Sequence, residues 1–288
     1  MIKTKLNLKN DIIFKAFFSR KGNEEFLVDF LNALLKIEIK QIIIREEVSL
    51  QQLSVQEKGG RLDLQAILND GVIVNIELQI QNEKNIKERT TLYSSKVLAR
   101  EVGKGTRYED IKQVIMINIL DYELLGFEEY ISETAIVLDK HREYEVLKGI
   151  KWYFIELPKF RRAYPDMNEK INQWLAFIDD YDKEGIELAE KNNKTLERAR
   201  FEMNCLTGDA AVQRLAELRE KWDMDWNSGM YWAKEEGKEE GIKQGKEENK
   251  KEIARKLIKM KLPIEQIMEA TGLTREQIEK IEQEDKEE

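Results

Sequence analysis

Two acidic side chains, Asp63 and Glu77, carry the chemistry that this sequence can be expected to perform. They lie in two alternating segments, residues 61–68 and 72–80, which a three-residue Asn69-Asp70-Gly71 loop joins in a predicted β-hairpin. Counting outward from the loop places Asp63 directly opposite Glu77, with Cβ atoms about 4.5–5.5 Å apart. Like charges in that arrangement repel, so something must offset them.

A divalent cation is one way to offset the two carboxylates, because carboxylate, carbonyl and water oxygens suit Mg²⁺ or Mn²⁺. Such an ion lowers the pKa of bound water and neutralises charge that builds on a phosphodiester in the transition state. Three other solutions stay open on the sequence alone: a protonated carboxyl, a salt bridge to Arg61, and a solvated pair on an exposed face.

The register of this hairpin follows from its apolar pattern. One face carries only apolar residues, namely Leu62, Leu64, Ala66 and Leu68 on the first strand and Val72, Val74, Ile76 and Leu78 on the second. The other face places Gln79 beside Glu77. A slip of one residue sets Leu62 and Leu64 against polar partners, so the register is well specified.

The elements around the hairpin predict a layered α/β or α+β domain. Apolar residues at helical spacing follow Asn10-Asp11 and Asn23, which indicates two amphipathic helices. The β-branched residues 42–44 predict a strand before the hairpin, extending from Gln41 to Ser49. Three more strands are predicted later, at residues 114–120, 134–138 and 151–157.

Residues 81–102 predict a long helix with a basic face. Its apolar residues are expected to cluster on one side and are Ile86, Leu92, Val97, Leu98 and Val102. On this helix Arg89 and Tyr93 lie one turn apart on the same face. Contact with a phosphate and a stabilising surface pair are equally compatible with that spacing.

The second half of the chain becomes helical after Pro158 and Pro165. Residues 233–251 then repeat glycine every fourth position, at Gly237, Gly241 and Gly245, which predicts a linker or a weak helix because each glycine costs a helix about 1 kcal/mol. The predicted organisation has four parts: a core at residues 1–160, a helical extension packed on it at 161–232, this repeat at 233–251, and a small helical hairpin at 252–288.

The helical tail has clear boundary signals. Thr274 and Gln277 have capping-box spacing, and Gly272 suits a helix C-terminus. Although the tail looks like a helix-turn-helix motif, its many glutamates would face phosphates, so it predicts binding to a protein partner or self-association. The five tryptophans, Trp152, Trp174, Trp222, Trp226 and Trp232, are predicted to be core or interface anchors.

Overall charge does not exclude a nucleic-acid substrate. The net charge is −8, but residues 1–120 hold 19 Lys and Arg against 16 Asp and Glu, whereas the other 168 residues hold 29 against 40. The first ten residues lack the pattern of a secretory signal, and no apolar run is long enough to cross a membrane. Together with the single Cys205, these features predict a cytoplasmic protein.

The segment RLDLQAILNDGVIVNIELQIQ, residues 61–81, resembles the PD-(D/E)XK nuclease superfamily, and within it the transposase-like branch that includes the Rpn recombination-promoting nucleases. In that branch an Asp follows a Gly-rich stretch, as Asp63 follows Gly59-Gly60, and a Glu-x-Gln lies across the hairpin, as Glu77-Leu78-Gln79 does here. Further similar pieces are residues 10–15, the helix with Arg89 and Tyr93, residues 155–160, the Gly-Lys-Glu-Glu repeats and the Thr-Gly-Leu-Thr tail.

The resemblance implies a restriction-endonuclease-like mixed sheet flanked by helices, and an Mg²⁺-dependent or Mn²⁺-dependent endonuclease that acts on DNA in recombination or transposition. Asp63, Glu77 and the backbone carbonyl of Leu78 would hold the metal, and Gln79 would position water. The wider superfamily has lysine at the position of Gln79, and glutamine brings no charge. A catalytically inactive protein that acts as a DNA-binding or protein-interaction scaffold is the alternative.

The superfamily often adds one acid from the first helical region. The candidates here are Asp11, Glu24 and Glu25. The sequence favours the plainer interpretation for each, because Asp11 also makes a helix N-cap and both glutamates fit as solvated side chains.

Overall fold

The computed structural model describes residues 6–45, 64–82, 84–102 and 105–287, and it forms two compact units, Met1–Arg219 and Glu220–Glu288. The strands are β1 (Ile42–Arg45), β2 (Leu64–Leu68), β3 (Ile73–Gln79), β4 (Val114–Leu120), β5 (Ile131–Glu133), β6 (Ile136–Leu138), β7 (His141–Leu147) and β8 (Ile150–Glu156). The helices are α1 (Asp11–Ser19), α2 (Glu24–Leu35), α4 (Ile86–Glu101), α5 (Leu157–Ala163), α6 (Lys170–Asp179), α7 (Lys183–Asn192), α8 (Lys194–Gly208), α9 (Ala210–Lys259), α10 (Ile264–Thr271) and α11 (Arg275–Glu287). Of these helices, none in the described ranges is long and apolar enough to cross a membrane.

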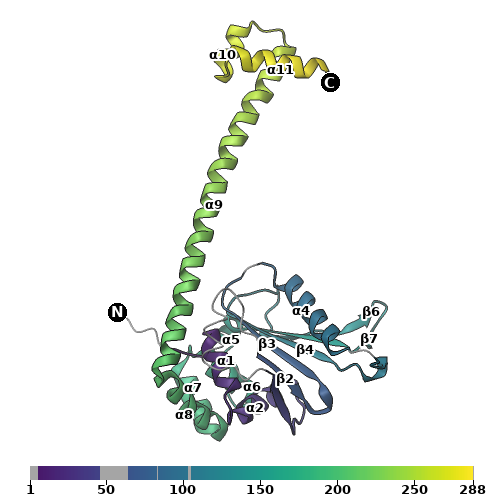
Figure 1. Ribbon diagram of the computed structural model, residues 1–288, viewed down its shortest axis with the longest axis vertical. Helices are drawn as coiled ribbons and strands as arrows, with labels where there is room; N and C mark the ends of the chain where they lie inside the picture. The colour runs from purple at the N-terminus through teal and green to yellow at the C-terminus, as the bar shows by residue number, and fades with distance from the viewer. Residues whose placement is uncertain (1–5, 46–63, 83, 103–104, 288) are drawn as a thin grey trace. The chain divides into compact units, whose positions relative to one another are not determined.

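A mixed six-stranded sheet organises the first unit, in the order β1-β2-β3-β4-β8-β5. The pairs β1–β2, β2–β3 and β5–β8 are antiparallel, whereas β3–β4 and β4–β8 are parallel. In Figure 1, α4 lies against one face of this sheet and α1, α2 and α6 lie on the other. The predicted mixed sheet flanked by helices is therefore confirmed.

The predicted hairpin register is confirmed over the described residues. Leu64 pairs with Ile76, and the Leu68 amide donates to the Val72 carbonyl at 2.8 Å. Gly71 has a φ of 83°, the left-handed conformation that a three-residue loop requires of its glycine. The pairing fixes which face of the sheet each β3 side chain takes.

Asp63, Arg61 and Leu62 lie outside the described residues, so the predicted contact between Asp63 and Glu77 stays a prediction. The same holds for residues 46–49 at the end of the predicted first strand, of which the structure describes Ile42–Arg45.

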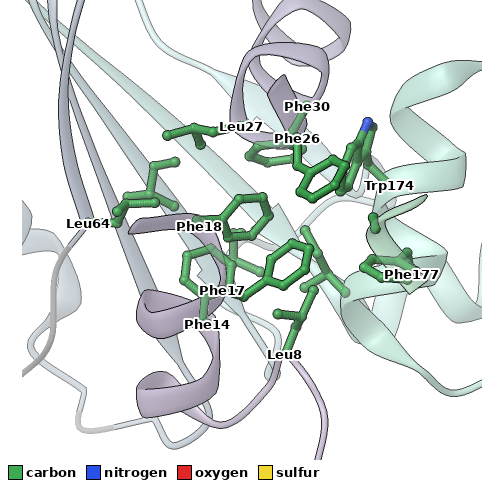
Figure 2. Close-up of a cluster of buried hydrophobic side chains, with 14 of the residues drawn as sticks. Leu8, Phe14, Phe17, Phe18, Phe26, Leu27, Phe30, Leu64, Trp174 and Phe177 are labelled. Atoms are coloured by element: carbon green, nitrogen blue, oxygen red, sulfur yellow. The ribbon is translucent and has the colours of Figure 1, made fainter. Parts of the chain in front are cut away.

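The main core lies between the sheet and helices α1, α2 and α6, and it is rich in aromatic rings (Figure 2). Phe17 is fully buried and stacks on Phe26 with ring centroids 5.4 Å apart. Trp174 of α6 is also fully buried, and its indole nitrogen donates to Asp29 at 3.0 Å. Asn10 caps α1 as predicted, since its side chain accepts from the Ile12 and Ile13 amides.

Helix α4 covers the opposite face, and its buried side differs from the prediction. Leu92 and Val102 were expected in an apolar cluster, but they are 52% and 40% exposed. The buried residues of α4 are Ile86, Thr90, Ser94 and Val97. Half of that stripe is polar because the sheet face beneath it also carries polar side chains.

The strand predicted at residues 134–138 was only partly correct. The chain forms β5 before Thr134 and β6 after it, and the strand β7 was not predicted. β7 pairs with β6 in a separate two-stranded sheet, and its side chains are mostly exposed. Alternation against a core is the main sequence signal for a strand, and β7 has no core to alternate against.

Residues 233–251 lie within α9, so the structure shows the helical one of the two predicted alternatives. At the end of the chain, α10 and α11 pack on the last turns of α9 around Ala254, Ile267, Leu273, Ile278 and Ile281. The predicted capping box is confirmed, because the Thr274 amide donates to Gln277 and the Gln277 amide to Thr274. Gly272 ends α10 with a φ of 70°.

The ring cluster predicts a large cost for truncating Phe17. We expect Phe17→Ala to lower the free energy of unfolding by about 3–5 kcal/mol, because its three aromatic neighbours lose contacts and leave a cavity. Urea unfolding followed by circular dichroism measures it. The matched control is Phe201→Ala, whose ring is 66% exposed and whose change should stay within about 0.5 kcal/mol. Equal costs for the two variants would contradict this placement of the core.

Candidate active site

Strand β3 presents Glu77 and Gln79 on the sheet face that α4 covers. The two residues alternate with Leu78, which points to the main core. β3 is an inner strand that pairs with β2 on one side and with β4 on the other. Glu77 is 1% exposed and Gln79 is 3% exposed, so both polar side chains are held within the fold.

Arg89 of α4 forms an ion pair with Glu77 through its Nη2 atom. The Glu77 side chain is 2% exposed and that of Arg89 is 12% exposed, so water screens this contact weakly. Removing either charge from such a pair is strongly destabilising. Arg89 is therefore turned toward the sheet, and the solvated acidic pair that the sequence left open does not apply to Glu77.

The two polar atoms of the Gln79 side-chain amide have different surroundings. Its Oε1 atom accepts a hydrogen bond from the Tyr122 hydroxyl at 3.0 Å, which fixes the direction of the amide group. Among the residues that the structure describes, the buried Nε2 atom has no hydrogen-bond partner. A buried donor without a partner costs free energy, so a group that accepts from it stabilises the site.

A polar layer continues from Glu77 across β4. Asn118, the register partner of Glu77, is fully buried and donates to the Tyr153 carbonyl at 3.2 Å. Its side-chain oxygen accepts from the Thr90 hydroxyl of α4 at 3.3 Å. Asn118 was not predicted from the sequence, although an asparagine inside the apolar run Val114–Leu120 was a usable signal.

A second buried charge pair lies at the end of β8, two strands from Gln79. Glu156 is fully buried, contacts Lys159 at 2.6 Å, and accepts from the backbone amides of Leu124 and Leu125. Register places Gln79, Leu120 and Glu156 level at the carboxyl ends of three parallel strands. Ligands of open α/β sheets commonly bind at that edge.

The three acids predicted from the first helical region form their contacts away from Glu77. Asp11 contacts Arg219 at 2.8 Å, Glu25 contacts Arg198 at 2.7 Å, and Glu24 accepts from the Gly22 amide. Helices α1 and α2 cover the face of the sheet opposite to Glu77. The structure thus brings none of these three acids to the Glu77 side chain.

Tyr93 separates from Arg89 despite the helical spacing. Its side chain is 37% exposed, with the Lys96 ammonium 5.8 Å from the ring centre. Arg89 instead turns inward to Glu77. Tyr93 therefore lies at the surface, whereas Arg89 contacts the sheet.

The donor chemistry of β3 fits a hard divalent cation. Glu77 supplies a carboxylate and Leu78 a backbone carbonyl next to it. Within the described ranges no group of three or more His, Cys, Asp or Glu residues gathers at one point, and Asp63 falls outside those ranges. The positive charge that contacts Glu77 in this structure belongs to Arg89.

A second ion pair holds the far end of α4. Arg45 of β1 contacts Glu101, with one of its two hydrogen bonds at 2.8 Å. Hydrogen bonds from Arg45 lower the pKa of Glu101 below its ordinary value, against a smaller opposing effect of burial. Together with Arg89 and Glu77, this pair fixes α4 on the sheet at both ends.

A family model described as PD-(D/E)XK nuclease family transposase matches residues 8–233. No curated protein and no solved structure matches the chain.

The Glu77–Arg89 contact predicts strong energetic coupling. We expect Arg89→Gln to lower the free energy of unfolding by about 3–5 kcal/mol, because the buried carboxylate loses its cationic partner. In the double variant Glu77→Gln with Arg89→Gln, the loss should be smaller than the sum of the two single losses. Chemical denaturation of all four proteins measures the coupling.

The control for that cycle is Arg100→Gln, at an exposed position of the same helix, which should change stability by less than about 0.5 kcal/mol. Additive effects of the two site substitutions would show that the charges do not interact in solution.

The Arg45–Glu101 pair predicts a pH-dependent contribution to stability. The folded-state pKa of Glu101 is lowered, so the pair stabilises the fold above the ordinary glutamate pKa of about 4.3 and is lost as pH falls through the lowered value. The pair is partly exposed, so we expect Glu101→Gln to cost at most about 1 kcal/mol near pH 7. Thermal unfolding of both proteins from about pH 7 down to about pH 3, which spans the glutamate titration range, measures the difference in stability. A difference that grows in acid would contradict the assignment.

Proposed function

This chain belongs to the PD-(D/E)XK nuclease family of transposases, and from that premise we propose that it is a DNA endonuclease dependent on Mg²⁺ or Mn²⁺. The observation that carries the proposal is the pair Glu77 and Gln79, buried side by side on an inner strand of a mixed sheet. This is the position at which the family resemblance expects its Glu-x-Gln.

Glu77, Asp63 and the carbonyl of Leu78 are the proposed ligands of the metal. When bound, a divalent ion lowers the pKa of water and neutralises charge on the phosphodiester. Glu77 has the right chemistry because its carboxylate already contacts a positive group in this structure. The proposal therefore includes an exchange in which the Arg89 guanidinium leaves Glu77 when the site is loaded.

Gln79 is the proposed positioning group for the attacking water. Tyr122 holds its amide oxygen, which leaves the Nε2 hydrogens as the donors directed at the site. The water oxygen would form a bond to phosphorus in line with the sugar oxygen as the bond between phosphorus and that oxygen breaks, and the proton that the water loses would pass through solvent to the sugar oxygen. Glutamine contributes a hydrogen bond where lysine would contribute a charge, so its effect rests on geometry.

Arg89 is the proposed contact for the scissile phosphate once it is released from Glu77. Its planar guanidinium can donate two parallel hydrogen bonds to phosphate oxygens, and it lies beside the residue that would hold the metal. The proposed physiological role is recombination or transposition of DNA, and the family description, which names a transposase, supports it.

Plasmid cleavage tests the proposal. We expect the wild-type protein to nick or cut supercoiled DNA with Mg²⁺ or Mn²⁺ and to lose this activity with EDTA. Asp63→Ala and Glu77→Ala should fall to background, and Gln79→Ala should lose about 100-fold, the typical cost of one positioned donor. Glu88→Ala, an exposed acid next to Arg89, is the matched control and should cleave like wild type.

Equal cleavage by wild type, Asp63→Ala and Glu77→Ala would refute the assignment, provided that circular dichroism shows the variants folded. Calorimetry with no uptake of either ion, together with DNA binding that Glu77→Ala leaves unchanged, would instead support an inactive DNA-binding scaffold. Faster cleavage of labelled RNA than of labelled DNA in competition would overturn the choice of substrate.

A further inference from the structure

One flank of α4 carries three basic residues and a tyrosine. At about 100° per residue, Tyr93 lies about 40° and Arg100 about 20° to one side of Arg89 around the helix axis. Lys96 lies about 20° to the other side. These four residues form the basic flank of α4, a sector of about 60° that extends over about 16 Å along the axis.

The acidic residues of α4 lie away from the basic flank. They are Glu88 and Glu101, which are about 100° from Arg89 on one side and about 120° from it on the other. The charge of Glu101 is also offset by Arg45 of β1, with which it forms an ion pair. The positive charge of the flank is therefore not neutralised by acids of its own helix.

Lys96 and Arg100 are the two exposed cations of the basic flank. Neither belongs to an ion pair with any residue in the part of the chain that the structure describes. An exposed arginine elsewhere in the first unit differs in this respect, since Arg107 contacts Asp110 at 2.9 Å. Lys96 and Arg100 therefore keep their charges in water, where an anionic ligand can approach them.

The basic flank begins at the proposed metal site, because Arg89 extends from it to Glu77 of β3. Lys96 follows Arg89 by about 10 Å along the helix axis, and Arg100 follows it by about 16 Å. On one strand of B-form DNA these distances correspond to a rise of about three and about five nucleotides. Phosphates a few nucleotides from the scissile one therefore lie within the length of the flank.

We propose that Lys96 and Arg100 bind phosphates of the DNA backbone beyond the scissile one, which rests on the proposed function because Arg89 is there the contact for the scissile phosphate. The two residues hold the DNA along α4 and so align it with the metal site. Contacts between basic side chains and phosphates carry no sequence information. The affinity that this flank supplies is therefore independent of DNA sequence, and it falls as salt rises because each neutralised phosphate releases counterions.

Fluorescence anisotropy of a labelled DNA duplex tests the proposal in EDTA, so that binding is measured without metal-dependent cleavage. The measured quantity is the slope of log Kd against log salt concentration for the full-length chain. We expect Lys96→Gln to make this slope shallower by about one, and Lys96→Gln with Arg100→Gln by about two. At low salt the double variant should bind on the order of tenfold more weakly than wild type, with the same loss on a duplex of unrelated sequence.

The matched control is Lys87→Gln, which removes the same charge from an exposed position about 160° around the same helix from Arg89. It should leave the salt dependence close to that of wild type. Circular dichroism establishes that each variant is folded. A wild type that does not bind the duplex, or equal changes of slope for Lys87→Gln and Lys96→Gln, would overturn the proposal.

Cleavage kinetics distinguish a failure of the basic flank from a failure of the proposed nuclease. In the double variant, the DNA concentration that gives half the maximal rate should rise in parallel with Kd. The rate at saturating DNA should stay within about twofold of wild type, because neither residue contacts the metal or the scissile phosphate. Weakened binding by the double variant of a protein that does not cleave would support the flank and reject the nuclease. Cleavage by wild type together with unchanged binding by the double variant would reject the flank alone.

Discussion

The buried contact between Glu77 and Arg89 is the constraint on which the arrangement of the first unit depends. An ionised carboxylate on an inner strand is costly to bury unless a positive group lies beside it. Arg89 meets that need only if α4 crosses the sheet with its first turns over β3. The second pair, Arg45 with Glu101, fixes the other end of the same helix. The position of α4 is thus set by ion pairs near both ends together with the apolar clusters around Ile86 and Val97.

The two faces of the sheet contribute differently to the stability of the fold. The face under α1, α2 and α6 holds a large aromatic core, which supplies most of the apolar burial. The face under α4 holds two small apolar clusters, one around Val97 and one around Ile86, on either side of the polar residues Glu77 and Asn118. Stability from the first face permits the second to keep buried polar groups that do not favour folding by themselves.

The surroundings of the long helix α9 change along its length. α9 begins with residues packed in the main core, including Val212 and Ala216, and continues into a stretch with exposed tryptophans and repeated glycines. The glycines lower the helix propensity of that stretch, whereas its many Lys and Glu residues favour helix. The capped hairpin of α10 and α11 closes the helix with a small core of its own.

The sequence by itself determined the features that depend on neighbouring residues. The hairpin register follows from alternation and from Gly71, the capping box from the spacing of Thr274 and Gln277, and the placement of Glu77 beside Gln79 from the period of a strand. Family membership was also visible there, because the order of the motifs is a property of the chain.

Only the tertiary structure decided which partners those residues have. The spacing of Arg89 and Tyr93 predicted a shared face, but α4 turns Arg89 toward Glu77 and leaves Tyr93 outside. Asn118 joins the polar layer from 41 positions beyond Glu77, through pairing of β3 with β4. A local pattern carries no information about such contacts, because the free energy of a buried polar group depends on whatever the fold brings beside it.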